Sequence, residues 1–184
     1  MQKLIFREEQ SFRQSFVVWL LAFVWLLTMG IFGYGLYQQL YLGKPFGDNP
    51  TSDNMLIIIS VLIVGMMTAI LLFFLNSTLI TEIWSDGIRY KFPPIIRRTR
   101  QIILHDISSA SVMKYNPVLE FGGWGWRKRL LSRKTAYSVT GSIGLRITLK
   151  SGHQIVIGTQ KQEEMKRAVT KMLELDIAKT QLDA

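Results

Sequence analysis

The sequence predicts a membrane-anchored α+β protein, in which a two-helix transmembrane hairpin precedes a seven-stranded antiparallel barrel capped by a C-terminal helix. Three observations predict this fold class. Residues 14–43 and 54–81 contain no charged side chain. The next part of the chain consists of short alternating segments separated by turn residues. An amphipathic helical pattern then ends the chain.

The two uncharged stretches are long enough to cross a membrane. A hydrocarbon core about 30 Å thick needs roughly 20 apolar residues in a helix. The first stretch is longer than the roughly 7 to 15 residues of a cleaved signal sequence, so we expect it to be retained. The predicted organisation is an N-terminal segment at 1–13, a hairpin at 14–76 with spans at about 15–41 and 54–76, and a domain at 77–184.

Basic residues predict the orientation of the hairpin. From residue 77 onward the chain has 18 Lys and Arg against 9 Asp and Glu, which accounts for the whole net charge of +9. Lys and Arg close to membrane spans stay on the cytoplasmic side. The sequence therefore predicts a multi-pass protein of the cytoplasmic (inner) membrane with both termini cytoplasmic. Tyr34, Tyr37 and Tyr41 recur near the outer end of the first span, where aromatic rings favour the interface.

The region after the second span has the pattern of short β-strands. An Asp-Gly turn at 86–87 joins predicted strands at 79–84 and 88–92, which is a strong hairpin signal. The other predicted strands are 100–104, 110–115, 136–139, 145–149 and 154–157. Thr159 and Gln162 form a capping-box pattern at the start of the final helix. Seven short strands in this length predict a small antiparallel barrel or sandwich, which the helix closes.

The segments Tyr115-Asn116-Pro117-Val118-Leu119-Glu120-Phe121-Gly122-Gly123-Trp124-Gly125-Trp126-Arg127, 136–145 and 157–160 carry a resemblance. With its Y-x-P-x-x-x-x-G-G-W-G-x-R pattern, the chain resembles small bacterial membrane proteins of uncharacterised function that pair two transmembrane helices with a cytoplasmic domain similar to bacterial PH (pleckstrin-homology-like) domains. The resemblance covers essentially the whole chain. It implies seven strands and a C-terminal helix, and it implies no particular activity.

Clustered cations are the candidate functional residues. A tethered domain gains on the order of 1 kcal/mol for each basic residue near an anionic leaflet. Trp126 is a candidate interfacial aromatic, because indole favours the half-wet layer. The predicted contacts to anionic lipid or a partner are Arg97, Arg98, Arg100, Arg127, Lys128, Arg129, Arg133 and Lys134.

Several other functions have little support in the sequence. The chain has no cysteine, which excludes disulfides and thiolate metal sites. His105 and His153 lie far apart and match no catalytic or metal-binding spacing, so we predict no enzyme, no catalytic residue, no metal and no cofactor. The resemblance to PH-like domains raises the question of an inositol-phosphate pocket, which would need cations in this part of the chain. Glu82 and Asp86 are acidic instead, so we do not expect such a pocket. No nucleic-acid motif accompanies the basic charge, so nucleic acid is not an expected partner.

Two functions remain as expectations. The first is a non-enzymatic membrane protein that presents a basic domain at the cytoplasmic face for contact with anionic lipids and proteins. The second is an accessory or regulatory subunit of a transporter or other membrane complex, in which the hairpin packs against other helices. A protein partner or a homo-oligomer is compatible with both. The absence of charge within the spans favours the first.

Overall fold

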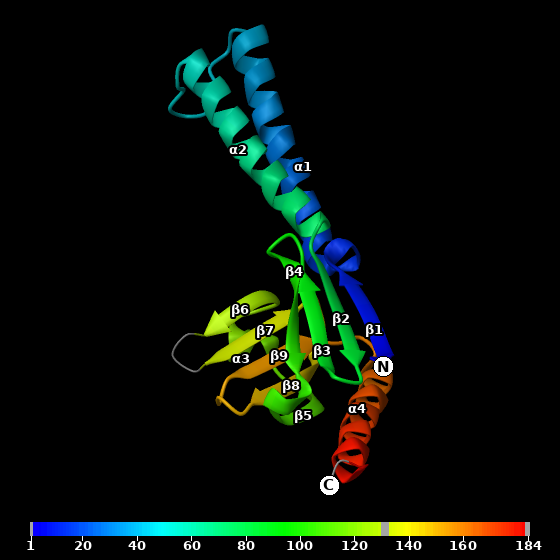
Figure 1. Cartoon of the computed structure of the whole chain (residues 1–184). Helices are drawn as coiled ribbons and strands as arrows, with labels where there is room; N and C mark the ends of the chain where they lie inside the picture. The colour runs from blue at the N-terminus through cyan, green and yellow to red at the C-terminus, as the bar shows by residue number, and fades with distance from the viewer. Residues whose placement is uncertain (1, 130–132, 183–184) are drawn as a thin grey trace. The chain divides into compact units, whose positions relative to one another are not determined.

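The structure is a computed structural model that describes residues 2–129 and 133–182, with side chains described to residue 175 (Figure 1). The chain divides into two compact units. One contains Met1–Phe12 and Ser77–Ala184, and the other contains Arg13–Asn76. We call them the domain and the hairpin and describe each by itself.

The hairpin consists of two long apolar helices. Helix α1 (Phe16–Leu36) begins at Ser15, whose hydroxyl accepts a hydrogen bond from Val17 N, and continues into the π-helical turn η2 (Tyr37–Tyr41). Helix α2 (Asp53–Leu75) follows a polar loop. The two are long and apolar enough to cross a membrane, over Phe16–Tyr41 and Asp53–Leu75. Trp25 joins them by donating from Nε1 to Thr68 Oγ1 at 2.8 Å.

The first sheet of the domain has the order β1-β2-β3-β4 and is antiparallel throughout. Its strands are β1 (Leu4–Ser11), β2 (Thr78–Trp84), β3 (Gly87–Phe92) and β4 (Ile96–Ile103). The predicted Asp-Gly hairpin is confirmed at the β2–β3 turn. Gly87 has φ 147°, and a Cβ there would lie 2.2 Å from the carbonyl oxygen of Ile102. No larger residue fits this turn without displacing β4.

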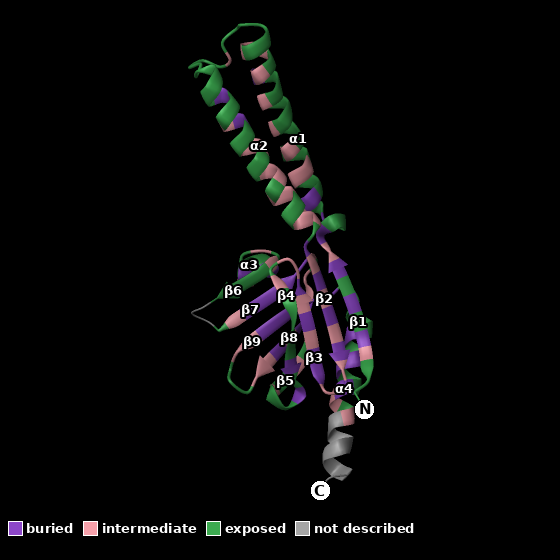
Figure 2. Ribbon diagram, turned by 45° about the horizontal axis from the view of Figure 1, so that its top comes forward, coloured by how far each residue is buried: buried purple, intermediate pink, exposed green. Residues whose placement is uncertain are grey.

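The second sheet has the order β5-β8-β9-β7-β6. After the short turn η3 (Leu104–Asp106) come β5 (Ile107–Lys114), α3 (Pro117–Phe121), β6 (Gly125–Arg129), β7 (Lys134–Ser138), β8 (Ile143–Leu149) and β9 (Gln154–Gly158). Tyr90 of β3 packs on Tyr137 of β7, with ring centroids 4.8 Å apart. The buried faces of the two sheets therefore meet around these rings (Figure 2).

Helix α4 (Gln162–Leu182) covers part of this core. It packs against β1, β2, β5 and β8. Met165, Ala168, Val169 and Met172 are buried, which confirms the apolar helix face that the sequence predicts. Residues of both sheets and of α4 thus share one core.

The predicted seven-stranded antiparallel barrel is wrong in three respects. The described residues contain nine strands, because β1 and β6 were not predicted. The strands form two separate sheets and no closed barrel. One pair, β7 with β9, is parallel, since β9 lies between β7 and β8. The sequence does not predict α3. It predicts a separate N-terminal segment at 1–13, whereas residues 4–11 form strand β1 of the domain.

Strand β1 was missed because its inward positions are partly polar. Phe6, Glu8, Gln10 and Phe12 are all buried, but only the two phenylalanines give a hydrophobic signal. The Glu8 carboxylate accepts hydrogen bonds from Thr159 Oγ1 at 2.6 Å and from Gln160 N at 2.8 Å. Gln10 Nε2 donates to the carbonyl oxygen of Gly158 at 2.7 Å. The N-terminal strand therefore holds the segment that leads into α4, some 150 residues away.

Replacing Glu8 should destabilise the domain. Glu8→Ala leaves the buried Thr159 hydroxyl and the Gln160 N–H without their acceptor, which costs about 1–3 kcal/mol for each buried polar group. Glu8→Gln keeps one acceptor oxygen and should cost less. The free energy of unfolding, measured by denaturant titration in detergent, checks this. Glu9→Ala is the matched control, because Glu9 is exposed; equal losses for Glu8→Ala and Glu9→Ala would contradict the assignment.

Candidate functional site

The first group of predicted basic residues lies on the edge strand β4. Arg97, Arg98 and Arg100 are all exposed. They line an open groove of about 410 Å³ together with Pro94, Ile95 and Ile96 of the β3–β4 turn. Ile95 is itself exposed. The groove therefore combines three cations with an apolar tip.

This groove lies at the end of the first sheet where the chain enters and leaves the domain. Phe12 N donates to Ser77 O at 3.2 Å, and Thr78 N donates to Pro93 O at 3.1 Å. The last residue pair of β1 and β2 is Ser11 with Thr78. The two chain exits and the β3–β4 turn are thus neighbours.

The second basic group lies on another edge strand, β6. The sequence does not predict a strand here, and the structure shows one, because Gly125–Arg129 pairs with β7. Arg127, Lys128 and Arg129 are exposed. Arg127 Nε donates to the carbonyl oxygen of Trp124, and Arg129 NH1 donates to that of Glu120. Two of these three cations therefore also form hydrogen bonds to carbonyl oxygens of the neighbouring backbone.

The remaining predicted cations follow residues 130–132, which lie outside the described part of the chain: Arg133 is a turn residue, and Lys134 is the first residue of β7. Arg133 is exposed and has φ 48°, and its carbonyl oxygen accepts a hydrogen bond from Gln154 N. Lys134 is half-buried and pairs with Arg129 across the strands. These two residues therefore continue the basic edge of β6.

The residues of the Tyr-to-Arg pattern build the α3 segment beside β6. Asn116 Oδ1 accepts from Val118 N and Leu119 N and so caps α3, while Gly122 ends it in the left-handed region. Tyr115 and Phe121 cluster with Ala136 and Val156 of the second sheet. Most of the pattern is thus explained by the packing of α3 on that sheet.

The outer side of this segment is an open groove, which we call the α3 groove. Its volume is about 680 Å³, and its lining includes Lys114, Pro117, Val118, Trp124 and Gly141. Trp124 is 37% exposed, with its Nε1 donating to Gly141 O at 2.9 Å. Glu120 at the groove is neutralised by Arg146 at 2.6 Å. The unpaired charge that the groove retains is therefore the exposed Lys114.

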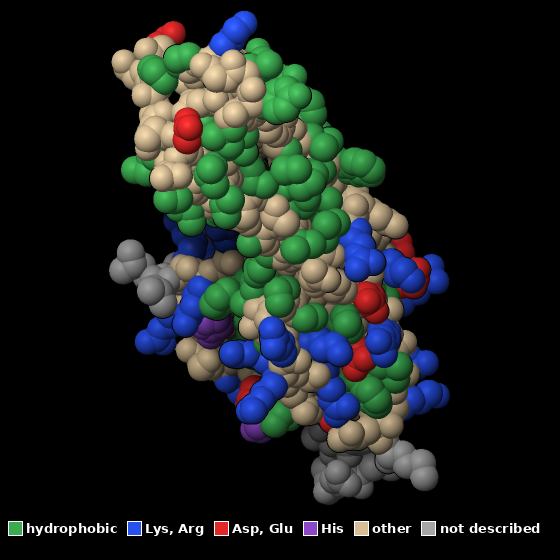
Figure 3. Space-filling view, turned by 90° about the horizontal axis from the view of Figure 1, so that it is seen from above, with side chains coloured by type: hydrophobic (Ala, Val, Ile, Leu, Met, Phe, Trp, Pro, Cys, Tyr) green, Lys and Arg blue, Asp and Glu red, His purple; other side chains and the backbone are tan. Residues whose placement is uncertain are grey.

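The two basic groups thus occupy the outer edges of two different sheets. On the face of the domain shown in Figure 3, Lys and Arg side chains are distributed over the surface with acidic side chains among them. Edge strands commonly carry charged side chains, especially cations, because these prevent pairing with other exposed strands. Protection of the edges therefore accounts for part of the basic charge, independently of any ligand.

One aromatic contact joins the two sheets in the core. Arg100 pairs with Tyr90, and Trp126 pairs with Tyr137, so the Tyr90–Tyr137 contact joins the two sheets below both edges. Burial raises the pKa of Tyr90 well above its usual range, Tyr137 raises it further, and Arg100 opposes this. Trp126 on β6 is 44% exposed.

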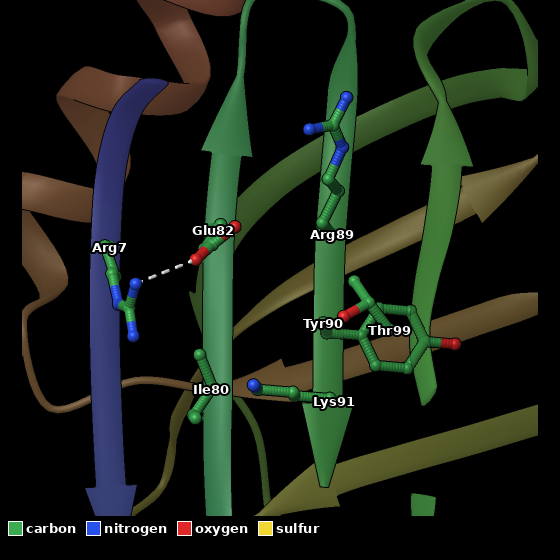
Figure 4. A pocket seen from close by; sticks show the side chains of 7 residues that line it. All are labelled: Arg7, Ile80, Glu82, Arg89, Tyr90, Lys91 and Thr99. Carbon is green, nitrogen blue, oxygen red and sulfur yellow. Dashed lines mark ion pairs between the residues drawn. The ribbon is translucent and has the colours of Figure 1, made fainter. Parts of the chain in front are cut away.

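A small pocket on the solvent face of the first sheet was not predicted (Figure 4). It has a volume of about 70 Å³ and is lined by Arg7, Ile80, Glu82, Arg89, Tyr90, Lys91 and Thr99. Arg7 is paired with Glu82 at 3.3 Å, and Arg89 is paired with Asp86 at 3.0 Å and lies 4.4 Å from the centre of the Trp84 ring. Because two of its three cations have partners, we interpret the pocket as a charged sheet surface.

The predicted interfacial tyrosines lie together near the loop end of the hairpin. Tyr37 and Tyr41 stack with ring centroids 5.3 Å apart, and Tyr34 meets Phe46 of the loop at 6.4 Å. All three tyrosines are exposed. Elsewhere, within the described residues, no three His, Asp or Glu side chains gather in a metal-binding cluster. His153 is bonded to Thr135 through Nε2 at 3.0 Å.

Comparison with known proteins places the chain in a family. The model of a family of unknown function (DUF6141) matches residues 1–174, and the chain belongs to this family. No curated protein matches the chain. The match includes β1, the hairpin, both sheets and most of α4, so it covers both units of the chain.

The buried Tyr90 hydroxyl predicts a loss of stability at alkaline pH. Tyrosine in an unfolded chain titrates near pH 10, whereas folded Tyr90 keeps its proton to higher pH. Above about pH 10, folding therefore loses up to about 1.4 kcal/mol per pH unit through this residue. Tyr90→Phe should make the alkaline decline shallower, measured by denaturant unfolding between about pH 9 and pH 11.5. The exposed Tyr34 gives the control Tyr34→Phe; identical slopes for wild type and Tyr90→Phe would refute the prediction.

Proposed function

We propose that this member of the DUF6141 family is a non-enzymatic integral membrane protein, whose α1 and α2 span the cytoplasmic (inner) membrane and whose domain contacts anionic lipid at the cytoplasmic face. In this proposal the two sheets and α4 are a variant of the bacterial PH-like fold, with β1 and β6 as additional strands. The observation that carries the proposal is the exposed apolar surface of the hairpin.

The exposure of the helices supports spanning. In the most apolar 18-residue stretches of the two helices, only 6% and 11% of the residues are buried. Phe16, Trp19 and Val61 are 77%, 70% and 66% exposed. Soluble monomers rarely expose contiguous apolar patches larger than a few hundred Å². Figure 3 shows hydrophobic side chains gathered along the hairpin, as a lipid-facing surface requires.

Strand β1 supports retention of α1. A cleaved signal sequence would take with it everything N-terminal to the cleavage site. Here that part includes β1, which pairs with β2 over Leu4–Ser11 and carries the buried Glu8. Loss of β1 would expose the edge of β2 and the buried face of α4, so the folded domain supports an uncleaved α1.

The same pairing supports a single-sided arrangement of the termini. Residues 4–11 precede α1, and residues 78–84 follow α2, yet they are adjacent strands of one sheet. Both ends of the hairpin must then lie on one side of the membrane. The basic character of the chain from residue 77 onward supports the cytoplasmic side.

The β3–β4 turn is the proposed lipid contact. Three peptide links separate Leu75, the last residue of α2, from Thr78, which is bonded to Pro93. An extended chain covers at most about 3.6 Å per residue, so Thr78 lies within about 11 Å of the end of α2. In this proposal Ile95 enters the interfacial layer, and Arg97 and Arg98 bind lipid phosphates.

Cysteine labelling in intact cells tests the topology. The chain has no cysteine of its own, so each single-cysteine variant is labelled only at the introduced position. Asp48→Cys, in the loop of the hairpin, should react with a membrane-impermeant maleimide from outside. Glu9→Cys and Glu163→Cys should react only after permeabilisation. Labelling of Glu9→Cys and Glu163→Cys from opposite sides would overturn the single-sided arrangement.

Spin labelling tests the lipid contact. A nitroxide on Ile95→Cys in the full chain should become more accessible to oxygen in nanodiscs with about 30% phosphatidylglycerol than in pure phosphatidylcholine, because each nearby cation adds about 1 kcal/mol of attraction. Adding Arg97→Glu and Arg98→Glu should remove this difference. Glu163→Cys on α4 is the control position. If positions 95 and 163 respond alike to anionic lipid, the β3–β4 turn is not the contact.

A further inference from the structure

Strand β6 is an outer strand of the second sheet, and among the described residues it pairs with a strand on one side only. The sheet ends with β6 on one side and β5 on the other, and α4 packs against β5. On β6, the short helix α3 packs beside the strand and lies over one face of the sheet, through Tyr115 and Phe121 (Figure 2). The backbone edge of Gly125–Arg129 therefore has no strand beside it in the described structure.

Large apolar side chains surround this edge. Leu119 and Val118 on α3 are 79% and 56% exposed, and Trp126 on β6 is 44% exposed. The α3 groove begins at Trp124, next to the first residue of β6. A free edge, exposed anchors and an adjoining groove together form the kind of site that takes an extended peptide by strand addition.

The charge of the edge selects its occupant. Arg127, Lys128 and Arg129 are consecutive and exposed, so pairing with β6 of a second copy would place like charges opposite one another. Like charges directly opposite in a sheet are destabilising. An added strand with carboxylates at these positions would gain a favourable cross-strand pair instead. The charge of the edge therefore disfavours pairing with a second copy and favours pairing with an acidic strand.

The alternation along β6 places cations on both faces. Arg127 pairs with Ala136, which packs under α3, whereas Trp126 pairs with Tyr137, which faces the other sheet. Lys128 lies on the same side as Trp126 by the two-residue period of a strand. An added strand would thus meet a cation and an apolar side chain on each face of the sheet. These are Arg127 and Leu119 on the α3 side, and Lys128 and Trp126 on the other side.

We propose that the β6 edge and the α3 groove bind an extended acidic segment of a partner protein, which adds to the second sheet as a further strand. This site is independent of the proposed lipid contact, which uses β4 and the β3–β4 turn of the other sheet. One domain then offers one basic edge to the membrane and another to a protein.

Fluorescence anisotropy with the full chain in neutral detergent tests the proposal. The probe is a labelled synthetic peptide of about ten residues with alternating glutamate and valine, a length and pattern suited to one added strand. It should bind, and Lys128→Glu should weaken binding about fivefold, as expected for reversing one rim charge. Leu119→Ser should also weaken it. On peptide binding, hydrogen exchange of the amides of residues 125–129 should slow.

Three controls make the outcome decisive. A peptide with lysine in place of glutamate should not bind, and one with every backbone amide N-methylated should bind at least about tenfold more weakly, because neither of its edges can donate N–H groups to the ladder. Arg98→Glu on β4 should leave peptide affinity unchanged. Absence of binding, equal affinity for the methylated peptide, or a Lys128→Glu effect confined to anionic nanodiscs would overturn strand addition. None of these results depends on the lipid contact at Ile95.

Discussion

The pairing of β1 with β2 is the constraint on which the rest of the structure depends. It joins residues separated by the whole hairpin, from Ser11 paired with Thr78 to Leu4 paired with Trp84. Through Glu8 and Gln10 it also reaches residues 158–160 at the start of α4. The hairpin is thus an insertion between two adjacent strands, and a domain lacking its first residues would lose a strand and a buried carboxylate together.

This insertion explains what the sequence could and could not predict. The hairpin was predictable, because Phe16–Tyr41 and Asp53–Leu75 are predominantly apolar and each is long enough to cross a bilayer. The Asp-Gly turn before β3 was predictable from local chemistry. Strand β1 was not, because Glu8 and Gln10 occupy inward positions and their partners lie about 150 residues away. Strand β6 was not, because its five residues include Gly125 and three consecutive cations and lack apolar alternation.

The candidate site was predictable in composition and unpredictable in arrangement. The sequence singles out Arg97, Arg98 and Arg127–Arg129 as candidate contacts to an anionic partner, and in the structure all five are exposed. Their assignment to two different sheet edges depends on the strand order, in particular on the parallel pairing that places β9 between β7 and β8. Local patterns do not encode this order. What resembled one basic surface in the sequence is therefore two surfaces with different neighbours.

Edge protection and ligand binding are consequences of the same charges. A cation on an edge strand repels the same edge of another copy, and it also favours any anionic group that reaches the strand. At β4 the nearby chain exits and the exposed Ile95 favour a lipid surface, because the end of α2 is only three residues from Thr78. At β6 the exposed Leu119 and Trp126 provide contacts for side chains of an extended peptide. The neighbours of each edge, more than its charge, therefore determine which anionic partner it suits.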